Sequence, residues 1–169
     1  MTPDKRPKHG TKQKQVVSKK EVASRTRPSS NDTHQIVFFR RHKDDDPARG
    51  TPARDFLNDE CPPAVRLKFQ NILVNVAKTP PKKFDGGGVW EAMHGDMTGW
   101  FEAKADGPRR THYRLYCRID LDAIGGTAPL LVIVSGMKKM FMTKLSPLDY
   151  AKVRALGDEY FSHNPRSLE

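Results

Sequence analysis

The sequence predicts an α+β domain in which helices pack against one antiparallel-rich sheet of about five strands. Three observations support this fold class. Apolar residues recur at helical spacing over about residues 62–78 and form one stripe. Apolar and polar residues alternate with a period of two in the segments expected as strands within residues 89–120. Residues 129–135 are nearly all apolar, as in a central strand covered on both faces.

The N-terminal half of the domain is expected to supply one strand and a helical hairpin. Residues 36–41 are mostly β-branched and aromatic, which predicts the first strand. The loop that follows contains three consecutive acids, Asp44–Asp46. Their side chains diverge, which indicates a solvated loop and not a metal cage. Thr51 is expected to cap a short helix over residues 52–58, and Pro62-Pro63 open the second, longer helix.

Four further strands and a closing helix complete the prediction. The strands are expected over residues 89–94, 100–105, 111–120 and 129–135, and turns rich in Gly, Asp and Pro separate the first three. Ser146 is placed to cap the final helix, because Pro147 suits the first helical position and Asp149 lies in the electropositive first turn.

Length and charge predict one domain with a basic tail. The 169 residues carry 30 Lys and Arg against 20 Asp and Glu, a formal net charge of +10 at pH 7. Residues 1–35 hold nine of the basic residues and three of the acids, but few large apolar side chains. This composition predicts a disordered tail that either contacts phosphates or only solubilises the chain. The folded domain is then expected over residues 36–165.

The composition also favours a cytoplasmic protein. Cys61 and Cys117 lack metal-ligand spacing and cannot build a dense disulfide framework, so reduced thiols are expected. No window of the sequence approaches about 18 consecutive apolar residues. The basic N-terminus is not followed by the apolar segment of a signal peptide. Neither a membrane-spanning helix nor export is therefore expected.

The strand expected over residues 111–120 carries the main candidates for chemistry. Alternation places Tyr113, Leu115, Cys117 and Ile119 on one face, and His112, Arg114, Tyr116, Arg118 and Asp120 on the other. Glu102 and Lys104 share a face of the neighbouring strand. Cations bind phosphate oxygens, aromatic rings stack on bases, and Glu or His moves protons, so such a face suits a phosphodiester. The alternative is a solvated face on which Glu102 and Lys104 form an ordinary surface ion pair.

Several other kinds of site are not indicated. Gly86–Gly88 lacks the Gly-Lys-Ser/Thr of a phosphate-binding loop. No Cys/His cluster indicates zinc, no carboxylate cluster indicates a two-metal nuclease, and no Gly-x-Ser-x-Gly indicates a hydrolase. Neither a metal nor a cofactor is therefore expected. Trp90 and Trp100 are expected in the core rather than as base-stacking platforms.

Four segments, in this order, resemble the RelE/HigB superfamily of bacterial toxins, especially its phage-associated branch. They are the Lys82–Gly87 loop (KKFDGG) before Trp90-Glu91, the strand Phe101–Lys104 (FEAK), the strand Tyr113–Tyr116 (YRLY), and the apolar strand that ends in Lys138-Lys139 before a C-terminal helix. The resemblance covers about half the chain, and the whole body if residues 36–78 supply the family's first strand and helical hairpin. It implies a RelE-like fold.

The resemblance also implies a function. A member of this family is the toxin of a type II toxin–antitoxin system, and it cuts mRNA on the ribosome without a metal or small-molecule cofactor. Its partners would be ribosome-bound mRNA and a cognate antitoxin protein. By this resemblance Arg114 and Lys138 would stabilise charge on the phosphoryl oxygens, together with Lys104. His112 or Glu102 is the candidate to accept the 2′-hydroxyl proton, and the residues expected to bind RNA are Arg110, Arg118, Lys139 and Tyr116.

The alternative is a protein that binds without cutting. Some members of the superfamily have a Tyr or His shortly after the last strand, where Met140–Thr143 offer no proton-transfer group. Related folds inhibit DNA gyrase, and a basic nucleic-acid-binding phage accessory protein would also fit the charge. The two interpretations differ in how they respond to mutation. Loss of Arg114 would abolish cleavage, whereas binding would decline gradually and with salt as several cations are removed.

Overall fold

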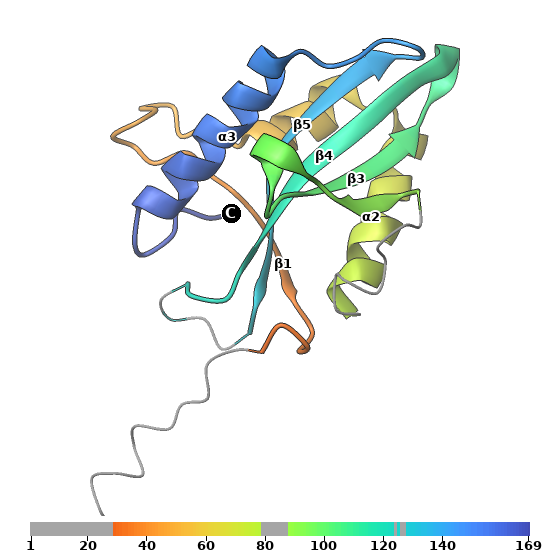
Figure 1. The fold of residues 1–169 in the computed structure, drawn as a ribbon. Coiled ribbons are helices and arrows are strands. Elements are labelled where there is room, and N and C mark those ends of the chain that lie inside the picture. The colour runs from red at the N-terminus through yellow and green to blue at the C-terminus, as the bar shows by residue number, and fades with distance from the viewer. Residues whose placement is uncertain (1–28, 79–87, 124, 126–127) are drawn as a thin grey trace, which may run out of the picture.

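The computed structural model describes residues 29–78, 88–123, 125 and 128–169, and these residues form an α+β domain (Figure 1). The strands are β1 (Gln35–Phe38), β2 (Trp90–Ala92), β3 (Phe101–Asp106), β4 (Thr111–Asp120) and β5 (Leu130–Met140). The helices are α1 (Pro52–Asp55), the π-helix η2 (Phe56–Glu60), α2 (Pro63–Lys78), the short 3-10 helices η4 (Gly95–Met97) and η5 (Pro108–Arg110), and α3 (Pro147–Ser162). The predicted α+β class and the predicted order of elements are confirmed.

The five strands of this described part form one mixed sheet with the order β1-β5-β4-β3-β2. β1 runs parallel to β5, and all other neighbouring strands are antiparallel. The chain between β1 and β5, which contains the helical hairpin and strands β2, β3 and β4, supplies the long connection that parallel neighbours need. β5 is an interior strand between β1 and β4, and its residues Leu130–Val134 are all buried, as the apolar run predicts.

Helices cover both faces of the sheet, and Figure 1 shows α2 and α3 on opposite sides of it. On the face that we call the α2 face, the hairpin packs Phe69 and Leu73 against sheet residues such as Leu115. On the opposite face, which we call the α3 face, Val153, Gly157 and Tyr160 are the buried residues of α3, and Val153 and Tyr160 belong to the core there. Each face therefore has its own hydrophobic core. None of the described helices is long and apolar enough to cross a membrane.

Local sequence signals explain most helix positions, with one exception. The α2 residues Val65, Phe69, Leu73 and Val76 are buried, as their helical spacing predicts. At the start of α3, the Ser146 hydroxyl accepts a hydrogen bond from the Asp149 N–H, and the Asp149 carboxylate accepts one from the Ser146 N–H. The cap predicted at Thr51 does not form. Its hydroxyl instead donates to the Glu169 carboxylate at 2.9 Å, a partner from the far end of the chain.

The domain is longer at both ends than the predicted range of 36–165. His34 is buried, and its N–H donates to the Ala77 carbonyl at 2.8 Å. At the other end Leu168 forms a β-bridge with Phe39, and the Glu169 N–H donates to the Phe38 carbonyl at 2.9 Å. The C-terminal residues thus lie beside the end of β1. Most of the tail predicted over residues 1–35 lies outside the described residues.

A β-bulge in β5 changes which of its side chains share a face. Tyr116 of β4 lies opposite Ser135, but Cys117 lies opposite Ile133, so Val134 is an extra residue in β5. Beyond the bulge, even-numbered residues turn to the α2 face. Gly136 therefore lies under the Phe56 ring. A Cβ atom added to Gly136 would come within 2.1 Å of a ring carbon of Phe56. β5 also continues to Met140, five residues beyond its predicted end.

Candidate nucleic-acid interface

The polar side chains of β4 share the α3 face, as alternation predicts, but α3 covers only part of them. Tyr116 and Asp120, toward the end of β4, are buried. His112 and Arg114, at its beginning, keep 27% and 18% of their side chains exposed. Arg118, in the second half, is half-buried against Phe161 of α3. The first half of the face is therefore the part most open to a ligand. We call it the open face, and it also carries side chains from β3 and β5.

Tyr116 does not serve the stacking role expected of it. The side chain is fully buried and lies edge-on to Tyr150 of α3, with 6.2 Å between the ring centroids. Burial strongly raises the pKa of its hydroxyl, and the nearby Tyr150 and Glu102 raise it further. The hydroxyl has no hydrogen-bond partner among the described residues. A base cannot reach this ring without displacing α3, so Tyr116 is a core residue.

Arg118 is also removed from the open face. Its guanidinium lies 5.2 Å from the Trp100 ring and 5.0 Å from the Phe161 ring, distances typical of cation–π contacts. Burial lowers its pKa, and the acids Asp158 and Asp120 oppose this shift. Trp100 and Trp90 are buried, which confirms the prediction that both belong to the core. Arg118 therefore packs α3 against the sheet rather than offering a free cation.

The open face does bring together the predicted cations and carboxylate of β3 and β4. Lys104 and Arg114 lie directly opposite each other across the two strands. Glu102 lies between them, accepting a hydrogen bond from Arg114 and pairing with Lys104 at 3.3 Å. Lys104 also pairs with Glu91 of β2. The carboxylates hold both cations in place on neighbouring strands, while the Arg114 Nε has no partner among the described residues.

Lys138 and Lys139 lie on opposite faces of the sheet, because β5 continues through them. Lys138 lies opposite Tyr113 and pairs with Glu60 of η2, which raises the pKa of the Lys138 ammonium. Lys139 lies opposite His112 on the open face. The expectation that Lys138 lies on the same face as Arg114 is therefore wrong. The bulge at Val134 is the reason, since it exchanges the faces of all later β5 residues.

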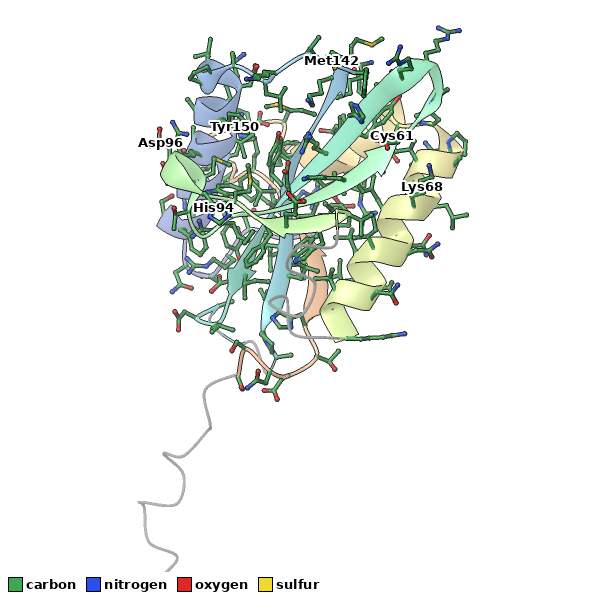
Figure 2. All side chains as sticks on the ribbon, turned by 45° about the vertical axis from the view of Figure 1, so that its right-hand side comes forward. Cys61, Lys68, His94, Asp96, Met142 and Tyr150 are labelled. Atoms are coloured by element: carbon green, nitrogen blue, oxygen red, sulfur yellow. The ribbon has the colours of Figure 1, made fainter. Side chains whose placement is uncertain are left out.

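An exposed aromatic residue borders the open face, and the sequence analysis overlooked it. Phe141 follows β5 directly and is 43% exposed. The Arg110 guanidinium lies 4.3 Å from its ring, and the His112 ring lies 5.5 Å from it. Met142, labelled beyond the end of β5 in Figure 2, is even more exposed. The available signal was an aromatic residue two positions after Lys139, in a segment interpreted only as lacking a proton-transfer group.

A cleft of about 580 Å³ lies along the free edge of β3 and opens to these residues. The cations that line it are Lys68 of α2, Lys104, His112 when protonated, and Arg114. The Lys68 ammonium donates to the Asp106 carbonyl at 2.6 Å, and the Asp106 carboxylate contacts the His112 ring. The Lys82–Gly87 loop belongs to the segment outside the described residues. The cleft offers a phosphate group several donors within one concave surface.

The described geometry defines a class of site: a cation-rich sheet face with an adjoining cleft and an exposed aromatic rim. Such a surface suits a single-stranded nucleic acid, since cations bind the backbone and rings stack on bases. Comparisons with protein-family models, with curated proteins and with solved structures find no match. The case for a function therefore depends on the residues themselves.

Proposed function

We propose that this chain is a RelE/HigB-type toxin that binds ribosome-bound mRNA on its open face and cleaves it. The observation that carries the proposal is the Arg114–Lys104 pair, placed on facing strands and held by Glu102 beside an open cleft. Two cations on neighbouring strands can contact two oxygens of one phosphate. The helical hairpin after β1, which the family resemblance implies, also supports the proposal.

The proposed reaction is an internal transesterification that uses the chain's own groups. The 2′-hydroxyl attacks the adjacent phosphorus, and the bond from phosphorus to the 5′-oxygen breaks, giving a cyclic phosphate and a 5′-hydroxyl. Arg114 and Lys104 stabilise the charge that grows on the phosphoryl oxygens. Glu102, freed when the phosphate takes over these cations, accepts the 2′-hydroxyl proton. His112, in contact with Asp106, supplies a proton to the leaving oxygen.

Lys139 and the aromatic rim complete the proposed RNA surface. Lys139 lies opposite His112 on the open face, so it takes the phosphate-binding role that the resemblance gave to Lys138. Arg110 is exposed above the Phe141 ring, and both can contact the nucleotide next to the scissile phosphate. As proposed here, one strand of RNA passes from Phe141 across His112 and Arg114 into the cleft. A cognate antitoxin protein would block this surface.

The test is primer extension on a defined mRNA in a reconstituted translation system. The wild type is expected to cut at discrete in-frame positions, only when ribosomes are present. Arg114→Ala is expected to cut about 10²–10³-fold more slowly, the usual cost of removing one donor to a developing oxyanion. The control is Arg49→Ala, an exposed arginine in the loop between β1 and α1. It should cut like the wild type.

The neighbouring lysines supply a sharper comparison. Lys139→Ala is expected to lose most cleavage, whereas Lys138→Ala, on the opposite face, is expected to keep it. Equal losses in both variants would contradict the geometry of the site. If the wild type leaves the mRNA intact, or if activity declines gradually and with salt across several cations, the binding alternative is supported instead. A DNA supercoiling assay would then test gyrase inhibition.

A further inference from the structure

Two histidines and an aspartate from distant parts of the chain meet at the end of α3. His42 and Asp45 lie in the loop after β1, and His163 follows the last residue of α3. One ring nitrogen from each histidine and one oxygen of Asp45 all lie within 4.8 Å of one another. Divalent transition-metal ions are bound by this donor set of two imidazoles and a carboxylate.

Backbone and side-chain contacts bring the three donors together. The N–H groups of Asp45 and Asp46 donate to the His42 carbonyl at 3.1 and 2.9 Å, so the chain turns back on His42. This turn directs the Asp45 carboxylate to His163, where its oxygen lies 2.6 Å from Nε2. The two imidazole rings stack with centroids 3.9 Å apart and 18° between their planes, so one ring must rotate about its side-chain bonds before both nitrogens face one ion. The fold gathers the three donors, and this side-chain rotation completes the site.

The surroundings fix the loop to α3 and balance its charge. Arg41 pairs with Glu159 of α3 at 2.9 Å and contacts Asp46 at 3.8 Å, so its positive charge is neutralised locally. Glu159 also accepts a hydrogen bond from the His42 N–H. Nδ1 of His42 lies 3.3 Å from the Asp44 N–H nitrogen and 3.2 Å from the Asp44 carboxylate. In the tautomer that carries its proton on Nδ1, the imidazole donates to this carboxylate, which orients it as carboxylates do behind metal-binding histidines. A bound cation would thus meet a net negative donor set.

We propose that His42, Asp45 and His163 form a binding site for one divalent transition-metal ion of the zinc class, with Asp44 as an orienting residue. The three side chains are partly exposed, so water completes the coordination. The ion joins the loop after β1 to the C-terminal end of α3. Lys139 and Phe141 of the proposed RNA surface come before the N-terminal end of α3, whereas the metal site lies at its C-terminal end. The 16 residues of α3 make the helix about 24 Å long. The site is therefore structural and independent of the proposed cleavage.

The test titrates the untagged full chain, stripped of metal with a chelator, with ZnCl₂ alone in a calorimeter. One ion per chain is expected. His163→Ala and Asp45→Asn should each weaken binding at least about 10–100-fold, the range seen even for orienting residues. His94→Ala, an exposed histidine outside the cluster, is the matched control and should bind like the wild type. Adding Co²⁺ should give visible d–d absorption bands, which are expected to disappear in His163→Ala.

Thermal unfolding gives a second readout for variants that fold. Because an ion that binds only the folded chain stabilises it, zinc at about 100 times its dissociation constant should raise Tm by about 5–10 °C. That shift should be absent in Asp45→Asn, whose side chain nearly preserves the shape. The proposal fails if the wild type binds zinc no more tightly than His163→Ala. It also fails if His94→Ala weakens binding as much as the cluster variants do.

Discussion

Replacing Arg166 with methionine is expected to destabilise the domain by about 3–5 kcal/mol, the usual cost of removing one partner from a buried ion pair. The Arg166 Nε donates to the Asp120 carboxylate at 2.8 Å, and only 2% of the Asp120 side chain is exposed. Tyr160 donates to the same carboxylate at 2.8 Å. Methionine fills much of the space of the arginine stem, so the variant mainly removes charge and leaves a buried carboxylate without its cation.

Two features of the site adjust this magnitude. The Arg166 guanidinium also donates to the carbonyls of Phe161 and His163 at 3.0 and 2.8 Å, so its loss removes further hydrogen bonds. Each such bond contributes about 1 kcal/mol net. Against this, a variant that also carries Asp120→Asn no longer buries a charge. The double variant is therefore expected to recover at least about 1–2 kcal/mol relative to Arg166→Met alone.

The destabilisation should depend on pH. Burial alone raises the pKa of the Asp120 carboxyl, but hydrogen bonds from Arg166, Asp122 and Tyr160 together hold the pKa below its ordinary value. In the wild type this contribution is present above about pH 4 and is lost as pH falls through the lowered pKa. In Arg166→Met burial dominates and the pKa rises. The protonated form then folds at little cost, so the deficit should shrink from pH 7 to pH 4.

Urea denaturation followed by tryptophan fluorescence measures these differences in the free energy of unfolding. Arg54→Met is the control, because Arg54 pairs with Glu169 at a more exposed site and should cost less than about 1 kcal/mol. A cost below about 1 kcal/mol for Arg166→Met would refute the reasoning. So would a cost that is equal at pH 7 and pH 4, or one that Asp120→Asn does not relieve.

Two further predictions concern packing. Gly157→Ala should destabilise the protein by about 1–2 kcal/mol in urea denaturation, because its Cβ would lie 2.4 Å from the Trp100 ring and overpacking outweighs the gain in helix propensity. Ala155→Gly, at an exposed position of the same helix, is the control and should lose only the difference in helix propensity, about 0.5–1 kcal/mol. A Gly157→Ala variant more stable than the wild type would contradict the close packing of Gly157 against Trp100. Burial raises the pKa of Cys61 to about 11 and also raises that of Cys117. At pH 8 a thiol reagent should therefore label neither cysteine in the folded protein but both in urea, and rapid labelling of the folded protein would argue against a buried thiol.

The sequence by itself determined the elements and much of their chemistry. The stripe through α2, the alternation of β4 and the capping box at Ser146 are local patterns, and local patterns follow the periods of helix and strand. They were sufficient to predict the α+β class and to place Arg114, Glu102 and Lys104 on neighbouring strands. The polar character of one β4 face was likewise correct, because a period of two assigns side chains to faces without reference to the rest of the molecule.

Only the tertiary structure decided which parts of these faces are open and which distant residues meet. Alternation does not state that α3 covers Tyr116, because coverage depends on packing between elements far apart in the chain. One extra residue at Val134 exchanged Lys138 for Lys139 on the open face, and no local pattern predicts a bulge. The contact between Asp45 and His163 joins two segments 118 residues apart. Such contacts arise from the topology of the sheet, which the period of a sequence does not contain.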